Sequence, residues 1–146
     1  MKILLTSDIH GNKEIIEKIL LENQNCDYFF DAGDSQLNPN ELSPIITVKG
    51  NCDYNNDLLN SILFTTPLGK LYIQHSPNIP YHILQNQDIK IIINGHTHIP
   101  KHQVIENTHF INPGSVTYPR SSNVGTYMIL EISKEDIKII LKDVLF

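Results

Sequence analysis

The segment Asn94-Gly95-His96-Thr97-His98 follows the apolar run Ile89-Lys90-Ile91-Ile92-Ile93. This short run of branched apolar residues, ended by a turn signal, predicts a buried parallel strand. In open α/β sheets, ligands bind just outside the carboxyl ends of the strands, and a neutral imidazole is the commonest protein metal ligand. The segment therefore indicates either a metal site at the end of a strand or a polar turn that happens to contain two histidines.

Other predicted strands end in the same way. These strands cover residues 2–7, 26–31, 45–49 and 70–74. The ligand-type residues that follow them are Asp8, His10, Asp34, Asn51 and His75. Asp and Asn also cap helices and form turns, so a structural role explains Asp8 equally well, but it does not explain His10. The repetition favours a shared site at the ends of several strands.

The remaining pattern mixes helices with β-hairpins. Apolar residues recur at helical spacing after the first strand, which predicts a βα start to a layered sheet. Helices are expected over residues 13–22, 55–63 and 79–87, with a loop or short helix over 37–44. Hairpins are expected over 64–74 and 101–111, and a β pair over 126–132 and 137–145. The turn Asn112-Pro113-Gly114-Ser115 is expected to offer backbone amides to an anion.

Composition limits the function classes. A chain of 146 residues with 40% hydrophobic and 18% charged residues favours one globular domain over 1–146. The net charge of −5 and the absence of a basic run argue against a nucleic-acid polymer or an anionic membrane as partner. Two cysteines form no disulfide framework, and no signal or membrane segment is evident, so we expect a cytoplasmic protein.

The candidate ligands combine carboxylate, amide and imidazole groups. They are Asp8, His10, Asp34, Asn51, His75, His96 and His98. Mixed oxygen and nitrogen ligands suit Mn, Ni, Fe or Zn better than Ca or Mg. Seven ligands are too many for one ion but suit two ions about 3.5–4 Å apart. Asp34 is expected to bridge the ions, and Mn is the expected metal. His82, His102 and His109 are assigned to surface or hairpin positions.

The ordered motifs resemble the calcineurin-like metallophosphoesterase superfamily. The motifs are Asp8-x-His10, Gly33-Asp34, Gly50-Asn51-x-Asp53, His75 and Gly95-His96-x-His98. The residues Cys52 and Asn112-Pro113-Gly114-Ser115 resemble its small YfcE-like phosphodiesterase branch. The resemblance implies a four-layer α-β-β-α sandwich with a di-metal site at the strand carboxyl ends.

The same resemblance implies a ligand set for each ion. The first set is Asp8, His10, Asp34 and His98. The second set is Asp34, Asn51, His75 and His96. The implied reaction is in-line attack of a hydroxide bridging the ions on a small or nucleotide-like phosphodiester. The catalytic roles are assigned to Asp34, Asn51, His75 and Cys52.

Two positions depart from the family pattern. Cys52 stands where many members have a histidine that protonates the leaving group, and a thiol is a weaker acid near neutral pH. This favours diesters with acidic leaving alcohols, unless Cys52 is only a half-buried filler. Asp53, without that histidine, is expected to be a turn residue, and Gln74 stands where glycine is usual before His75.

Residues that contact substrate are harder to assign. Arg120, the single arginine, suits bidentate phosphate contact, although surface arginines are frequent; Asn12 and Thr97 are further candidates. Tyr118 either stacks on a substrate ring or lies in the core. The alternatives are a phosphomonoesterase or nuclease of the same superfamily, or a non-catalytic scaffold like the retromer subunit of this fold, which would lack metal ligands. A homodimer stays open.

Overall fold

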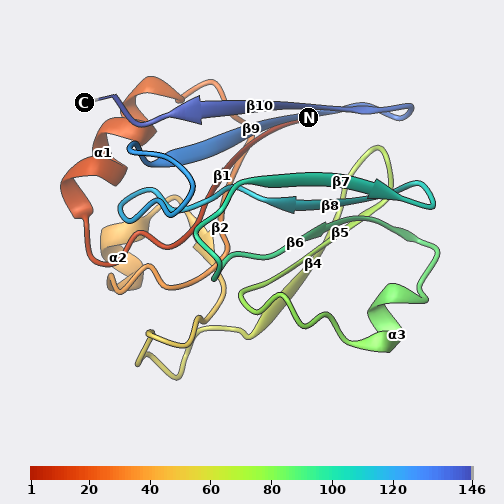
Figure 1. Ribbon diagram of the computed structural model, residues 1–146, viewed down its shortest axis with the longest axis horizontal. Coiled ribbons are helices and arrows are strands. Elements are labelled where there is room, and N and C mark those ends of the chain that lie inside the picture. Colours follow the sequence, from red (N-terminus) through yellow and green to blue (C-terminus); the bar gives the residue numbers. More distant parts are fainter. Residues whose placement is uncertain (146) are drawn as a thin grey trace.

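The computed structural model describes residues 1–145 as two five-stranded mixed sheets packed face to face (Figure 1). Phe146, the last residue of the expected domain, lies outside the described residues. The first sheet contains β1 (Lys2–Thr6), β2 (Tyr28–Asp31), β3 (Ile46–Thr47), β9 (Thr126–Ile132) and β10 (Ile137–Asp143). The second contains β4 (Ser61–Thr65), β5 (Lys70–Gln74), β6 (Ile89–Ile93), β7 (Lys101–Ile105) and β8 (Thr108–Asn112).

In the first sheet β1 is the central strand. The order is β10-β9-β1-β2-β3, with β1 parallel to β2 and antiparallel to β9. The outer face of this sheet is covered by α1 (Lys13–Glu22) and α2 (Pro39–Leu42). Ile16, Ile19 and Leu42 from these helices pack against Leu4 and Ile129. The predicted βα start is therefore confirmed.

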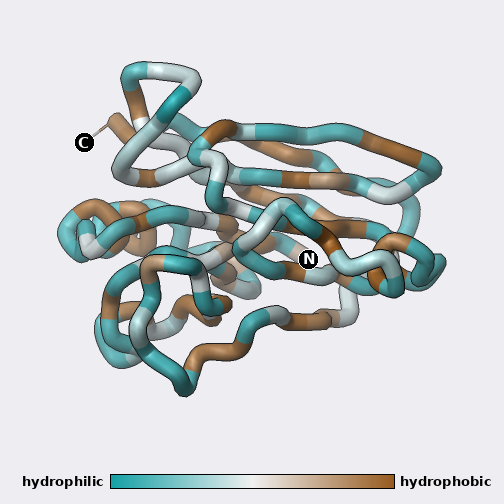
Figure 2. Tube along the Cα trace, turned by 60° about the horizontal axis from the view of Figure 1, so that its bottom comes forward, coloured by the Kyte–Doolittle hydropathy of each residue, from teal (hydrophilic) through white to brown (hydrophobic). Residues whose placement is uncertain are grey.

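The second sheet places β6 at its centre. The order is β4-β5-β6-β8-β7, with β6 parallel to both β5 and β8. On its outer face, Ile83 of α3 (Tyr81–Leu84) packs against Tyr72, Ile89 and Ile92. Between the sheets lies the largest core cluster, built from the inward side chains of both sheets. Figure 2 shows apolar stretches in many segments of the chain, interrupted by polar ones. The four layers are thus α-β-β-α, as the resemblance implied.

None of the helices within residues 1–145 has the length and apolar content of a membrane span. The longest, α1, has ten residues.

The helix expected over residues 55–63 is wrong. The segment 55–60 forms turns instead, and β4 begins at Ser61. Asn55 closes one turn, because its Oδ1 accepts a hydrogen bond from the Asp57 N–H at 2.9 Å. Beyond it, β4 alternates exposed and half-buried side chains, and Ile62 and Phe64 pack on the core between the sheets. The turn-forming Asn and Asp residues and this period of two outweigh the helical spacing of the leucines.

The carboxyl ends of the parallel strands meet at one edge of the sandwich. After β1 and β2, the Asp8 N–H donates to Gly33 O at 3.0 Å and the His10 N–H donates to Asp34 O at 2.9 Å. After β5 and β6, the Gly95 N–H donates to His75 O at 3.1 Å. These backbone bonds tie the loops into two pairs, so the ligand-type residues predicted at separate strand ends lie side by side.

Candidate metal centre

One group of ligand atoms gathers around Asp8. Asp8 Oδ1 lies 3.2 Å from His98 Nε2 and 3.7 Å from His10 Nε2. These two imidazole nitrogens are 3.4 Å apart, and His10 Nε2 lies 4.0 Å from Asp34 Oδ2. Two ligands bound to one ion at about 2.0–2.2 Å lie roughly 3–4 Å apart, depending on the angle between them. The group therefore has the spacing of ligands around one ion.

A second group gathers around Asn51 and His75. His75 Nε2 lies 2.9 Å from Asn51 Oδ1 and 3.1 Å from Asp34 Oδ2. His96 Nδ1 lies 3.1 Å from the same Asn51 oxygen. Asp34 Oδ2 thus faces both groups, while Asp34 Oδ1 accepts the Cys52 N–H at 2.7 Å. Asp34 Oδ2 is therefore placed to serve either ligand group.

Three of the four histidines have their second ring nitrogen held by an oxygen. Nδ1 pairs with Ala32 O in His75 at 2.8 Å and with Tyr118 O in His98 at 2.7 Å. In His10 it pairs with Gln36 Oε1 at 2.7 Å. Because these oxygens only accept, Nδ1 carries a proton, so in the neutral imidazole the lone pair sits on Nε2, which faces the carboxylates. This outer bonding is typical of histidines that bind a metal.

Asp8 Oδ1 is buried and has no hydrogen-bond partner among the described residues, whereas Asp8 Oδ2 accepts from Ser7 Oγ at 2.7 Å and from the His96 N–H at 3.1 Å. A fully buried, unpaired carboxylate oxygen is costly unless a cation balances its charge. The lone pairs of His10 and His98 point toward the same region. The residues present therefore fit a divalent ion.

Backbone strain is concentrated in the same loops. Five of the candidate ligands have positive φ angles between 48° and 73°, a region that side chains other than glycine rarely adopt. They are Asp8, His10, Asp34, His96 and His98. Such strain costs of the order of 1–2 kcal/mol per residue and collects at functional sites. In this chain the positive φ angles fall in the loops that carry the two ligand groups.

Asp34 and His75 each change the pKa of the other. Burial opposes the charge on Asp34, but hydrogen bonds from the protonated form of His75 and from the Cys52 N–H bring the pKa of Asp34 below its usual value. Burial also opposes a charge on His75, yet the Asp34 carboxylate and Ala32 O raise the pKa of that imidazole. The carboxylate is therefore ionised at neutral pH and available as a ligand.

Asp53 does more than the turn role expected from sequence. Its carboxylate is buried and accepts three backbone N–H groups, from Asp34 at 2.9 Å, Gly50 at 2.8 Å and Gln36 at 2.9 Å. These bonds fasten the loop that carries Asp34 to the loop that carries Asn51. Asp53 is therefore a positioning residue for both ligand groups.

Replacing Asp53 by asparagine is expected to weaken metal binding without removing a ligand. The amide has one acceptor oxygen, so at least one buried N–H loses its partner, at a cost of about 1–3 kcal/mol. Loss of an outer partner typically lowers metal affinity by roughly 10–100-fold. Calorimetric titration with Mn²⁺ and urea unfolding measure the two effects. Asp88→Asn, an exposed carboxylate away from the loops, is the control, and an unchanged affinity in Asp53→Asn would refute the positioning role.

The turn at residues 112–115 does not present amides to an anion, so that expectation is wrong. The Gly114 N–H donates to Asn112 Oδ1 at 2.9 Å within the turn. The Asn112 amide donates to Gly95 O at 3.1 Å and to Thr97 Oγ1 at 3.0 Å. The turn instead supports the loop that carries His96 and His98.

The structure gives mixed positions for the candidate substrate residues. Asn12 Oδ1 caps α1 by accepting from the Ile15 N–H at 3.3 Å, and Thr97 Oγ1 is bonded to Asn112. Arg120 is exposed, and its backbone N–H donates to His98 O at 3.3 Å. Tyr118 is 57% exposed beside His10, with ring centroids 5.5 Å apart, which excludes a core position. Arg120 and Tyr118 therefore lie on the loop that closes the Asp8 group.

The sandwich and the two groups of Asp, Asn and His ligands at its strand ends define the chain as a metallophosphoesterase. The sequence model of the calcineurin-like phosphoesterase superfamily domain matches residues 1–135, and the chain belongs to this superfamily. It is accordingly a phosphoester hydrolase from a family that uses divalent metals.

Comparison with similar proteins indicates the branch of the superfamily to which the chain belongs. The chain is 30% identical to probable metallophosphoesterase YsnB of Bacillus subtilis, covering 92% of this chain and 86% of YsnB. It is 27% identical to phosphodiesterase YfcE of Escherichia coli, covering 90% and 88%. A solved structure of a predicted phosphoesterase from Streptococcus pneumoniae matches with a TM-score of 0.82 and 26% identity, covering 98% of this chain and 89% of that one. The matches support the YfcE-like branch.

Proposed function

We propose that the chain hydrolyses small phosphodiesters with the help of two divalent ions, and that Mn²⁺ is the preferred ion. One observation carries this proposal. Three histidines have Nδ1 hydrogen-bonded to an oxygen outside the ligand groups, and their Nε2 atoms lie near the buried, unpaired Asp8 Oδ1. The resemblance to a phosphodiesterase of Escherichia coli supports the substrate class.

The ligand groups suggest which residues hold each ion. Asp8, His10 and His98 would hold one ion, and Asn51, His75 and His96 the other. Asp34 Oδ2 would contact both. When bound, the ions supply Lewis acidity toward the attacking water and neutralise charge on the phosphoryl oxygens. The chain's own part is to fix this constellation on rigid strand ends.

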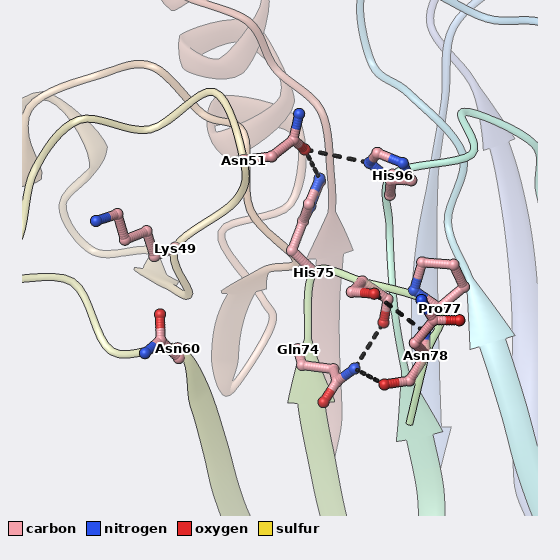
Figure 3. Close-up of a pocket in the computed structure, with 9 residues that line it drawn as sticks. Lys49, Asn51, Asn60, Gln74, His75, Pro77, Asn78 and His96 are labelled. Carbon is pink, nitrogen blue, oxygen red and sulfur yellow. Dashed lines mark hydrogen bonds between the residues drawn. The ribbon is translucent and has the colours of Figure 1, made fainter. Parts of the chain in front are cut away.

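A pocket of about 440 Å³ opens beside the second group (Figure 3). Asn51, His75 and His96 line it, and Figure 3 shows Lys49 and Asn60 across from them. A diester whose phosphorus lies between the ligand groups would place one ester substituent here. The pocket is large enough for a small organic group, which fits a small diester better than a polymer.

Gln74 shapes one wall of this pocket. Its amide donates to Ser76 O at 2.7 Å and Asn78 O at 3.0 Å (Figure 3). Its Oε1 accepts from the Tyr72 hydroxyl at 2.6 Å. Gln74 is buried, and its bond with the Tyr72 hydroxyl is shielded from water. The residue that replaces the usual glycine therefore holds the loop after His75 in place and does not disturb that ligand.

Cys52 lies beside both the bridging carboxylate and His10. Its Sγ belongs to a group of potential ligand atoms with His10 and Asp34. Burial, followed by the charge of Asp34, raises the pKa of the Cys52 thiol above its ordinary value. The thiol is a weak proton donor, so we propose that the enzyme prefers esters whose leaving alcohols need little protonation.

Replacing Cys52 by histidine is expected to raise kcat/KM on esters with poor leaving groups by about 10–100-fold, in the range of general acid catalysis. The rate on p-nitrophenyl esters should change much less, because nitrophenolate leaves without a proton. Comparing methyl and p-nitrophenyl phosphodiesters measures the difference. Cys52→Ser is the size-matched control. Equal rates for Cys52→His and the native chain on the methyl ester would sink the acid argument.

The assay of the proposed function compares bis-p-nitrophenyl phosphate with p-nitrophenyl phosphate in Mn²⁺, Ni²⁺, Mg²⁺ and chelator. We expect turnover of the diester with Mn²⁺ and none with chelator. Faster turnover of the monoester would support a phosphomonoesterase. No turnover of either ester with bound Mn²⁺ would support a scaffold, although all seven ligand positions are filled in this chain.

A further inference from the structure

Two histidines outside the ligand groups face each other on the β7–β8 hairpin. His102 Nε2 lies 2.9 Å from His109 Nδ1, and the ring planes are 10° apart with centroids at 5.2 Å. In the antiparallel register His102 lies opposite Ile111, and His109 lies opposite Val104. The histidines are therefore diagonal neighbours on one face, a spacing that long side chains can span.

The pair is accessible and separate from the di-metal ligands. All five residues of the edge strand β7 are exposed, and His109 is half-buried. The two histidines share their face with Ile111, which belongs to the core between the sheets. The pair therefore lies on the inner face of the second sheet. Because it sits at the exposed edge strand β7, an ion can reach it from solvent. It includes none of the residues in the Asp8 or Asn51 group.

We propose that His102 and His109 form a third metal site, which takes Cu²⁺, Ni²⁺ or Zn²⁺. Two imidazole nitrogens bound at about 2.0–2.1 Å and at right angles on one ion lie roughly 3 Å apart. The observed 2.9 Å between His102 Nε2 and His109 Nδ1 meets this requirement. Water completes the coordination.

The lowered pKa of His109 also favours metal binding near neutral pH. Burial, followed by the charge of His102, lowers the pKa of His109, although Asp136 opposes this. A neutral imidazole can present a lone pair without first losing a proton to solvent. In the present contact one of the facing nitrogens donates to the other. On binding, that proton moves to the other nitrogen of the same ring, so both facing nitrogens become ligands with no net proton release.

The ligand chemistry predicts selectivity against Mn²⁺. Two imidazoles without a carboxylate follow the order in which Cu²⁺ binds most tightly and Mn²⁺ most weakly. The di-metal ligands, in contrast, include carboxylate and amide oxygens that suit Mn²⁺. Mn²⁺ should therefore fill the Asp8 and Asn51 groups and leave the hairpin pair free.

The test is a metal titration of the native protein and of His102→Gln. The protein is saturated with Mn²⁺, then titrated with Ni²⁺ and, separately, Cu²⁺, with calorimetry and elemental analysis as readouts. We expect the native chain to bind one equivalent more than His102→Gln at each endpoint. Electron paramagnetic resonance of that extra Cu²⁺ should show coupling to two nitrogens. His109→Gln is expected to behave as His102→Gln does.

His82→Gln is the matched control, because His82 is exposed on α3 and has no histidine partner among the described residues. It should bind as many equivalents as the native chain. Equal stoichiometry in the native chain and His102→Gln would overturn the proposal. Loss of an equivalent in His82→Gln would do the same. The comparison does not depend on turnover, so the hairpin site can fail while the phosphodiesterase proposal stands, and the reverse.

Discussion

Replacing Asp34 by asparagine is expected to remove high-affinity binding of both ions and, with it, hydrolysis. Asp34 Oδ2 lies 3.1 Å from His75 Nε2 and 4.0 Å from His10 Nε2, so one oxygen serves both ligand groups. The amide keeps the size of the side chain but loses the charge that balances two cations. Loss of an outer partner already costs roughly 10–100-fold in affinity or activity. Loss of the shared ligand should exceed that range.

The measurement pairs Mn²⁺ calorimetry with kcat/KM on bis-p-nitrophenyl phosphate. Asp57→Asn, an exposed carboxylate change on a turn of the same segment as Asn51, should match the native chain in both. Urea unfolding without metal checks that Asp34→Asn folds. A folded Asp34→Asn that binds two ions with native affinity would refute the shared ligand.

Replacing Gly50 by alanine is expected to have a comparably large effect without touching a ligand. A Cβ at residue 50 would overlap Asp34 Oδ1 and crowd the Asp34 backbone nitrogen at 2.5 Å. The backbone cannot yield easily, because the Asp53 carboxylate holds the N–H groups of both Asp34 and Gly50. Overpacking a tight site costs typically 1–3 kcal/mol. We expect that loss of stability together with a displaced Asp34 and weak binding of Mn²⁺.

Gly11→Ala is the informative control for Gly50→Ala. A Cβ at residue 11 meets nothing within 4 Å, but the φ of +77° is strained for alanine. It should therefore lower stability by about 1–2 kcal/mol while Mn²⁺ affinity stays near native. Urea unfolding and calorimetry give the two numbers for each variant. If Gly50→Ala bound Mn²⁺ as tightly as Gly11→Ala, the close approach would not be what positions Asp34.

The sequence could place the candidate ligands near one another because each one lies within a few residues of the end of a strand. Strand polarity brings the carboxyl ends of β1, β2, β5 and β6 to one edge, so local order along the chain carries spatial information. The isoleucine run before Gly95 is indeed the central strand of its sheet, parallel to both neighbours. The hairpins and the first helix follow from equally local patterns of period two and 3.6.

Residues that support the ligands were missed because their roles depend on contacts across the chain. Gln36 bonds to His10, 26 positions away, and Asn112 bonds to Gly95 and Thr97 from a different strand. Nothing in their local sequence marks them. Asp53 carried a hint, because it matches the aspartate of the family motif although Cys52 stands in place of the neighbouring histidine. Polar side chains that bond to distant backbone follow from the fold and not from periodicity.

We propose that the strand ends hold two ions per chain. Protein purified without chelator, loaded with Mn²⁺ and freed of excess metal should contain about two equivalents by elemental analysis. Mn²⁺ is the right probe because the hairpin histidines should not retain it. About two equivalents in the native chain, with a large loss in Asp34→Asn, is the result we predict. One equivalent or none in the native chain, or an unchanged content in Asp34→Asn, would contradict it.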